Sequence, residues 1–220
     1  MSAKKPATTP IPVQLSETEF TEFILPHLSM PRRGPKCKLG YHHVFNLILW
    51  VLYTGMQWKC LPVPKAPDGT DAIHYTTLYR AFARWSDDGS LKQAFIASVA
   101  QLSVHNLLDL SILHGDGTHT VAKKGGDGIG YSGYKHQQGD KVIAIVDNNG
   151  YILAPLPVAP VNEADTVLLP DGLKALKRIG KQTGLSFKDR YLNLDGGFDS
   201  ASHRKAIFNA GLIPNVKENP

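Results

Sequence analysis

The sequence predicts a mixed α/β protein in which a helical N-terminal part precedes a sheet flanked by helices. In the first half, apolar residues recur at helical spacing, whereas in the second half short apolar strands alternate with helices. Two of these strands end in an aspartate followed by glycine, Asp116 and Asp195. We therefore expect a flexible segment with a short helix at 1–34, a helical domain at 35–108 and an α/β domain at 109–220.

The helical part is predicted to begin with a short helix and to continue with three longer ones. Residues 16–28 open with a serine cap and glutamates in the first turn. The basic segment at 30–38 contains two prolines, which exclude a regular helix there. Amphipathic spacing then predicts helices at 41–54, 75–85 and 91–108. This arrangement is compatible with a helix-turn-helix module, in which one helix enters the major groove of DNA.

The three tryptophans of the helical part are Trp50, Trp58 and Trp85. Aromatic side chains fill protein cores more often than they form exposed stacking platforms. We therefore predict that these three residues form the core of the helical part.

The second half predicts five strands and two helices in the order βββαβαβ. The strands are expected at 111–118, 141–147, 151–159, 191–195 and 212–216. Asn148-Asn149-Gly150 is a tight-turn sequence, so the second and third strands should form a hairpin. Pro170 is predicted to begin a helix that runs to about residue 179, and Asp199 or Ser200 to cap a second helix that ends at Gly211.

This strand order, with one acid in the first strand and another ending the fourth, is typical of a ribonuclease-H-like fold. In that fold the fourth strand pairs in parallel beside the first, which would make Asp116 and Asp195 neighbours. Two close carboxylates repel each other unless a cation neutralises them. Carboxylate oxygens suit Mg²⁺, with Mn²⁺ as a substitute, and such ions can activate a water or a 3′ hydroxyl at a phosphodiester. We predict that both residues are metal ligands and catalytic.

Composition narrows the class of protein. The chain has 220 residues, is 42% hydrophobic and carries a formal net charge of +5 with a pI near 9.1, which favours a polyanionic partner. Its two cysteines, Cys37 and Cys60, lie in no CxxC motif, so neither a zinc site nor a disulfide framework is expected. No apolar run is long enough to span a bilayer and the N-terminus lacks the apolar core of a signal peptide, so a cytoplasmic location without a membrane partner is expected.

Several short motifs together resemble the DDE transposases of bacterial insertion sequences of the IS4 and IS5 groups. The matching pieces are Gly55-Met-Gln-Trp-Lys-Cys-Leu-Pro62, Tyr79-Arg-Ala-Phe-Ala-Arg-Trp85, Asp116-Gly-Thr118, Gly133-Tyr-Lys-His136, Val146-Asp-Asn-Asn-Gly150, Asn162-Glu-Ala-Asp165 and Asp195-Gly-Gly-Phe-Asp-Ser200. Each piece is weak alone, but their order and spacing are specific. The resemblance implies Mg²⁺-dependent strand cleavage at the ends of an element and strand transfer into target DNA. It carries Asp116 and Asp195 across as the first two metal-binding acids.

The chain departs from this family pattern at its end. The family's third acid is a glutamate on a helix after the fifth strand, whereas Glu218 lies in the connecting segment. The resemblance therefore predicts an incomplete ribonuclease-H-like sheet and a truncated transposase. An alternative is a catalytically inactive fragment that occupies element ends and inhibits the intact transposase. A metal-dependent nuclease unrelated to transposition is a weaker alternative, because it leaves the N-terminal motifs unexplained.

Other polar residues near the two acids have simpler explanations. Asp199 is predicted to cap a helix and Asp147 to belong to the hairpin turn. Asn162 and Asp165 either line the site from a loop or serve a turn and a helix cap. We expect His114 and His119 to face opposite sides of a strand, which would prevent them from sharing a metal.

Basic and aromatic residues predict the surface that contacts double-stranded DNA, including terminal repeats and target DNA. The loop from Lys123 to Lys141 combines six glycines with lysines and tyrosines, and lacks the strand and helix of a nucleotide fingerprint. A homodimer is also expected. The candidate DNA-contacting residues are Arg32, Arg33, Lys36, Arg80, Arg84, Lys123, Lys124, Tyr134 and Lys135, with Tyr131 as an alternative stacking residue.

Overall fold

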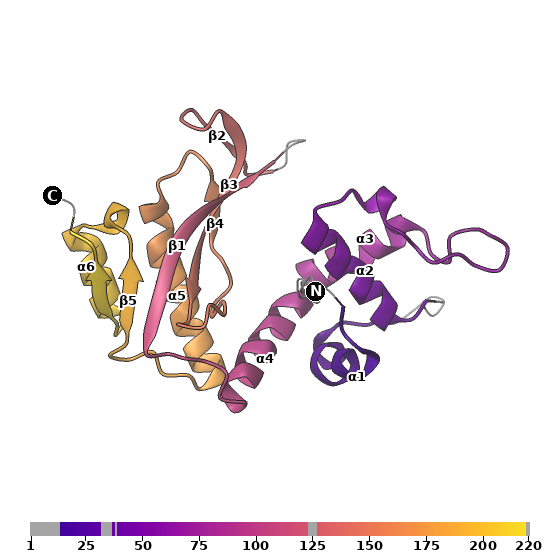
Figure 1. Cartoon of the computed structure of the whole chain (residues 1–220), viewed down its shortest axis with the longest axis horizontal. Helices are drawn as coiled ribbons and strands as arrows, with labels where there is room; N and C mark the ends of the chain where they lie inside the picture. Colours follow the sequence, from indigo (N-terminus) through magenta and orange to yellow (C-terminus); the bar gives the residue numbers. More distant parts are fainter. Residues whose placement is uncertain (1–13, 32–36, 38, 123–126, 219–220) are drawn as a thin grey trace, which may run out of the picture. The chain divides into compact units, whose positions relative to one another are not determined.

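A computed structural model describes residues 14–31, 37, 39–122 and 127–218. The chain divides into two compact units, one up to Ala94 and one from Phe95, and each is described by itself (Figure 1). The predicted division at residues 108 and 109 was placed where strands begin in the sequence. This boundary between the two domains stays a prediction.

The first unit is helical, as predicted. Ser16 forms a capping box with Glu19 and starts a helical run whose geometry changes from α to π to 3-10 before Leu28. The later helices lie close to their predicted positions, and Gly55 ends the first of them in the left-handed conformation at φ 65°. The elements are α1 (Glu17–Glu19), η1 (Phe20–Ile24), η2 (Leu25–His27), α2 (Tyr41–Thr54), η3 (Trp58–Cys60), α3 (Tyr75–Asp87) and α4 (Ser90–Val104), which continues into the second unit.

An aromatic core holds the first unit together. Trp85 is fully buried and its ring packs against Tyr41 and Phe45. Its indole N–H donates a hydrogen bond to the Ser29 carbonyl, so the one polar atom of the ring is satisfied. Trp50 and Trp58 are partly exposed and pack against the same core. The prediction that the tryptophans form the core of this unit is confirmed.

The second unit contains a six-stranded mixed sheet. Its strand order is β2-β3-β1-β5-β6, and β4 pairs with β3. Strand β1 runs antiparallel to β3 and parallel to β5, which in turn runs parallel to β6. The strands are β1 (Ile112–Val121), β2 (Gly130–Ser132), β3 (Gln137–Val146), β4 (Val158–Pro160), β5 (Tyr191–Leu194) and β6 (Ile213–Val216). Apart from the short β2, this is the predicted ribonuclease-H-like arrangement, and the fold class is confirmed.

Two helices cover the apolar side of this sheet. Helix α5 (Asp165–Thr183) lies along the sheet and α6 (Ala201–Asn209) beside it (Figure 1). Their buried side chains meet those of β1, β3 and β5 in one core that includes Leu113, Leu169 and Ile207. Gly172 lets α5 approach β3 closely, because a Cβ there would lie 3.3 Å from Ile143 Cγ2.

Two predicted elements were placed wrongly. Helix α5 does not begin at Pro170 but at Asp165, with the proline inside the helix. Pro170 is exposed and near the start of the helix, where the lost hydrogen bond falls on the solvent side. Strand β3 begins at Gln137 rather than Lys141, and much of the predicted third strand is irregular before β4. No helix of the described residues is long and apolar enough to cross a membrane.

Candidate metal centre

The pairing of β1 with β5 brings the two predicted acids together. The parallel register places Ile112 beside Tyr191 and His114 beside Asn193. Continued for two residues, past the end of β5, the same register would place Asp116 beside Asp195, and paired strands lie about 4.8 Å apart. The register fits the glycine at position 115, because a Cβ there would lie 2.6 Å from Leu194 Cδ2.

Both acids lie on the sheet face opposite the helices. In each strand, side chains alternate between the two faces. Leu192 and Leu194 are buried in the core, so Asn193 and Asp195 lie on the other face. Leu113 is fully buried in the same core, which places His114 and Asp116 on that other face as well. Both carboxylates are exposed.

Each carboxylate makes one short local hydrogen bond. Asp116 Oδ1 accepts the Gly117 backbone N–H at 2.8 Å. Asp195 Oδ1 accepts the Gly197 backbone N–H at 3.0 Å and thereby caps the 3-10 turn η4 (Gly196–Phe198). The second oxygen of each carboxylate makes no hydrogen bond with a described residue. Each acid is thus held by one oxygen and can offer the other to a ligand.

These two oxygens fit a hard cation such as Mg²⁺, which is held by one or two carboxylates and keeps several waters. Such a site does not resemble a closed structural metal site, which is built from three or four protein ligands. Within the described ranges, no group of three or more His, Cys, Asp or Glu side chains could hold a metal. The chemistry available is therefore that of an open, water-rich centre.

A row of side-chain hydrogen bonds crosses the same face of the sheet below the acids. Asn215 Nδ2 donates to Asn193 Oδ1 at 2.7 Å, and Asn193 Nδ2 lies 3.5 Å from His114 Nδ1. His114 Nε2 lies 3.2 Å from Asn148 Oδ1, and Asn148 Nδ2 donates to Asp109 Oδ2 at 2.8 Å. Because His114 Nδ1 faces a donor, its proton belongs on Nε2. All donors of this polar row therefore point toward Asp109.

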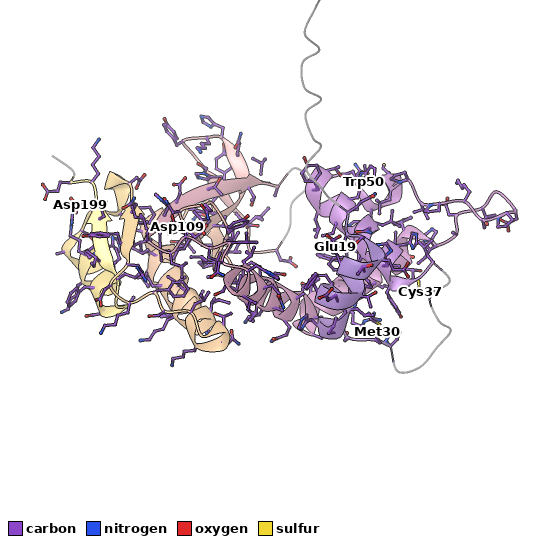
Figure 2. The ribbon with its side chains drawn as sticks, turned by 60° about the horizontal axis from the view of Figure 1, so that its bottom comes forward. Glu19, Met30, Cys37, Trp50, Asp109 and Asp199 are labelled. Atoms are coloured by element: carbon purple, nitrogen blue, oxygen red, sulfur yellow. The ribbon has the colours of Figure 1, made fainter. Side chains whose placement is uncertain are left out.

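Asp109, labelled in Figure 2, is the acceptor at which the polar row ends. Hydrogen bonds from the Ser111 side chain, the Asn148 amide and the Ser111 backbone N–H, together with the nearby charge of Arg190, lower the pKa of Asp109 to about 2. Its carboxylate is thus anionic at neutral pH and accepts hydrogen bonds only.

Two other aspartates have structural partners, as predicted, although one partner differs. Asp147 is fully buried and accepts backbone N–H groups of Asp109, Asn149 and Tyr151, which confirms its role in the turn. Asp199 (Figure 2) is not the cap of α6, because Ser200 Oγ accepts the His203 N–H there. Asp199 instead accepts a hydrogen bond from Arg204 Nε at 2.8 Å.

The remaining predicted polar residues have other partners or lie outside the described residues. Asn162 is exposed in a turn, and a Cβ at Gly130 would lie 1.8 Å from its Oδ1. The side chain of Asp165 lies outside the described residues. His114 belongs to the polar row, whereas His119 Nδ1 lies 3.1 Å from Lys135 Nζ. The two histidines thus have different partners.

Some of the predicted DNA-contacting residues lie in the description. Arg80 and Arg84 stand one turn apart on α3 and line a hollow of about 460 Å³ in the first unit, together with His74 and Tyr41. Arg84 Nε is buried and has no hydrogen-bond partner among the described residues. Arg32, Arg33, Lys36, Lys123 and Lys124 lie outside the described residues.

The predicted loop of residues 123–141 is in part a hairpin. Strands β2 and β3 pair through Gly130, Tyr131 and Ser132. Tyr134 at the tip is 93% exposed, whereas Lys141 belongs to β3 and is buried, with its Nζ donating to the Glu163 carbonyl. The predicted loop therefore ends earlier than expected, because β3 begins at Gln137. The apolar stem of Lys141 packs in the sheet, and its ammonium group donates to the carbonyl.

Comparison with known proteins gives one family. Residues 15–95 match the family model described as a putative transposase of the IS4/5 family. The match covers most of the first unit and confirms the predicted resemblance there. No curated protein sequence matches the chain.

Solved structures with some similarity are also transposases. A piggyBac transposase synaptic complex with hairpin DNA is 14% identical with a TM-score of 0.41, over 68% of this chain and 34% of that one. A Mos1 transposase paired-end complex with the left transposon end is 7% identical with a TM-score of 0.35, over 84% and 60%. A Mos1 mariner paired-end complex with Mn is 8% identical with a TM-score of 0.33, over 90% and 64%. The chain thus spans less than two thirds of each of these proteins.

Proposed function

We propose that this chain, whose residues 15–95 carry the sequence of the IS4/5 transposase family, supplies the DNA-binding helices and two metal-binding acids of a transposase. The helical unit would bind the ends of the element. Asp116 and Asp195 would hold Mg²⁺, or Mn²⁺ in its place, for cleavage of a DNA strand and its transfer to target DNA. The substrate is double-stranded DNA at terminal repeats and at the target.

The observation that carries this proposal is the parallel register of β1 and β5. Continued for two residues beyond His114 and Asn193, this register would lead to two aspartates from distant parts of the sequence, each exposed and each with one oxygen uncommitted. Ordinary turn-capping aspartates need no such pairing, since each satisfies only its own backbone.

The roles of the residues follow from their contacts. When bound, the metal would polarise a phosphodiester oxygen and lower the pKa of a bound water or hydroxyl. The Gly117 and Gly197 N–H groups orient the carboxylates of Asp116 and Asp195. Both acids are exposed, so a DNA backbone could reach them without a movement of the core.

The decisive experiment is cleavage of a duplex that carries the sequences flanking the gene, with Mg²⁺ or Mn²⁺. We expect strand cleavage by the chain and a loss of about a hundredfold or more in Asp116→Asn and in Asp195→Asn. Asp171→Asn is the matched control, because Asp171 is an exposed acid on α5 and pairs with Lys174. Equal cleavage by all variants would refute the assignment of the acids.

Binding of the metal ion gives a second readout that does not depend on cleavage. Titration with Mn²⁺, followed by calorimetry or by the electron spin resonance of the free ion, should show weak binding that either asparagine substitution reduces. Binding of DNA without cleavage, together with unchanged metal affinity in the variants, would leave recognition of element ends as the only function of this chain.

A further inference from the structure

The outer face of α5 and the loop that follows it form a cluster of basic residues remote from the two acids. We call Lys177, Arg178, Lys181 and Lys188 the basic face. Lys177 and Arg178 lie four and three residues before Lys181 on the helix, and all four residues are exposed. The opposite side of α5 carries Leu173, Leu176 and Ile179 into the core.

Residues from two segments meet at this surface. Lys177 and Lys181 of α5 line a shallow hollow of about 350 Å³ together with Lys188, which lies before β5. Leu185 and Phe187 line the same hollow, and Phe187 is buried. The fold thus brings cations that are eleven residues apart, as Lys177 and Lys188 are, to one concave spot.

Basic side chains outnumber acidic ones around the basic face, where Asp189 next to Lys188 and Asp171 are the acids. Between residues 171 and 190, six of the eight charged side chains are basic. Of the two flanking cations, Lys174 pairs with Asp171 at 2.8 Å and Arg190 acts on Asp109. The four residues of the basic face form no ion pair with a described residue. Four unpaired cations in one area repel each other, and an anionic partner would relieve this repulsion.

Stabilisation of the helix explains only one of these residues. A lysine in the last turn interacts favourably with the helix dipole, and Lys181 occupies that turn. Lys177 and Arg178 lie earlier in the helix and Lys188 lies beyond it. A contribution to helix stability therefore leaves most of the basic face unexplained.

The basic face lies at the opposite end of β5 from the metal centre. Lys188 comes shortly before Tyr191, the first residue of β5, whereas Asp195 directly follows Leu194, the last. The four residues of β5 separate the two ends by about 13 Å. A phosphate bound by these lysines is thus at a different place from one that meets the acids.

We propose that the basic face binds the phosphate backbone of duplex DNA, independently of base sequence, at a second place besides the metal centre. This inference rests on the proposed function, because it takes DNA as the substrate. Lysine and arginine side chains contact phosphates without reading bases. Phe187 is the aromatic residue among those that line the hollow, and because it is buried it offers no platform there for stacking on a single strand. Duplex DNA is therefore the partner that the basic face fits.

The test is the salt dependence of binding to a labelled random-sequence duplex of about three helical turns, since each neutralised phosphate contributes about 0.9 to the slope of log affinity against log salt. The variant replaces Lys177, Arg178, Lys181 and Lys188 with glutamine. The control replaces four other exposed lysines with glutamine, Lys65, Lys92, Lys205 and Lys217. Both variants remove the same charge, and thermal unfolding of each should match that of the original chain.

We expect the slope to fall by about 3 and affinity to fall at least tenfold at 0.1 M salt in the basic-face variant, with a much smaller change in the control. In the original chain, DNA should protect Lys177, Lys181 and Lys188 from acetylation but not Lys205. Equal losses in both variants, or unchanged protection, would overturn the inference. If the original chain cleaves DNA but the basic-face variant binds normally, the inference fails and the proposed function stands. If the original chain binds no DNA, both fail.

Discussion

The two ends of strand β5 present opposite charges. Asp195 directly follows its last residue, on the side toward Asp116 of the neighbouring strand, whereas Lys188 precedes its first residue and lines a hollow with Lys177 and Lys181 of α5. An anionic phosphate would need a bridging cation to approach the two aspartates, because like charges repel. It could bind the lysines at the other end of the strand directly. In the functions that we propose, one short strand thus separates the acids that would hold the metal from the cations that would bind the DNA backbone.

Removing the acids should have the largest effect. Asp116→Asn and Asp195→Asn should each weaken Mn²⁺ binding by about tenfold or more, and the double variant should be only slightly worse, because the two oxygens act as a unit. Isothermal titration calorimetry measures the affinities. Additive losses of affinity would mean that the two residues bind separate ions. That result would contradict a single metal site after the last residue of β5.

The close approach of β1 and β5 can be tested without touching an acid. In Gly115→Ala, the new Cβ would lie 2.6 Å from Leu194 Cδ2 in a packed core, so the free energy of unfolding should fall by about 1 to 3 kcal/mol. Gly133→Ala is the control, because nothing lies within 4 Å of its Cβ position. Urea unfolding gives both values. An unchanged stability in Gly115→Ala would contradict the packing of these strands.

The polar row should make a smaller contribution. His114→Ala removes the link between Asn193 and Asn148, which should cost about 1 kcal/mol of the free energy of unfolding. His119→Ala on the same strand is the comparison. If the row also positions the acids, Mn²⁺ affinity should fall in His114→Ala and not in His119→Ala. The two readouts then separate a purely structural role from a positioning role.

The smallest effect is expected from the pH dependence of stability through Asp109. Because its pKa in the folded chain is about 2, below the ordinary 3.8, Asp109 contributes stability above pH 3.8 that is lost as the pH falls through 2. The difference in thermal midpoint between the original chain and Asp109→Asn should therefore shrink across this window. A constant difference would show that the hydrogen bonds to this carboxylate do not depend on its charge.

Much of this arrangement was predictable from local patterns. Aspartates that precede glycine in or after an apolar strand indicated Asp116 and Asp195, although Asp116 lies inside β1, which continues to Val121, and only Asp195 follows the end of its strand. The turn at Asp147 followed from its neighbours Asn148, Asn149 and Gly150 in the same way. The sequence predicted the structure well where a residue type strongly prefers one local conformation.

Features that depend on distant partners were missed. Pro170 was predicted as the first residue of a helix, because proline is most often found there. Capping preferences do not show that proline is also tolerated inside a helix on its exposed side, where Pro170 lies. Lys141 was placed at the boundary between the predicted loop and the predicted strand, whereas it lies inside β3 and its Nζ donates to the Glu163 carbonyl. The helical spacing of Lys177, Arg178 and Lys181 could have been read from the sequence, but the position of Lys188 beside them follows only from the fold.

The polar row has a consequence for how changes in this sheet can accumulate. Each of its amides is oriented by the next, and the last partner is a carboxylate that can only accept. Reversing any one amide would set two donors or two acceptors against each other. Asn215 on the outermost strand is therefore held to one orientation by Asp109, which lies outside the sheet. A substitution at one of these positions should be retained only together with a matching substitution at the next, so the positions should evolve as a group.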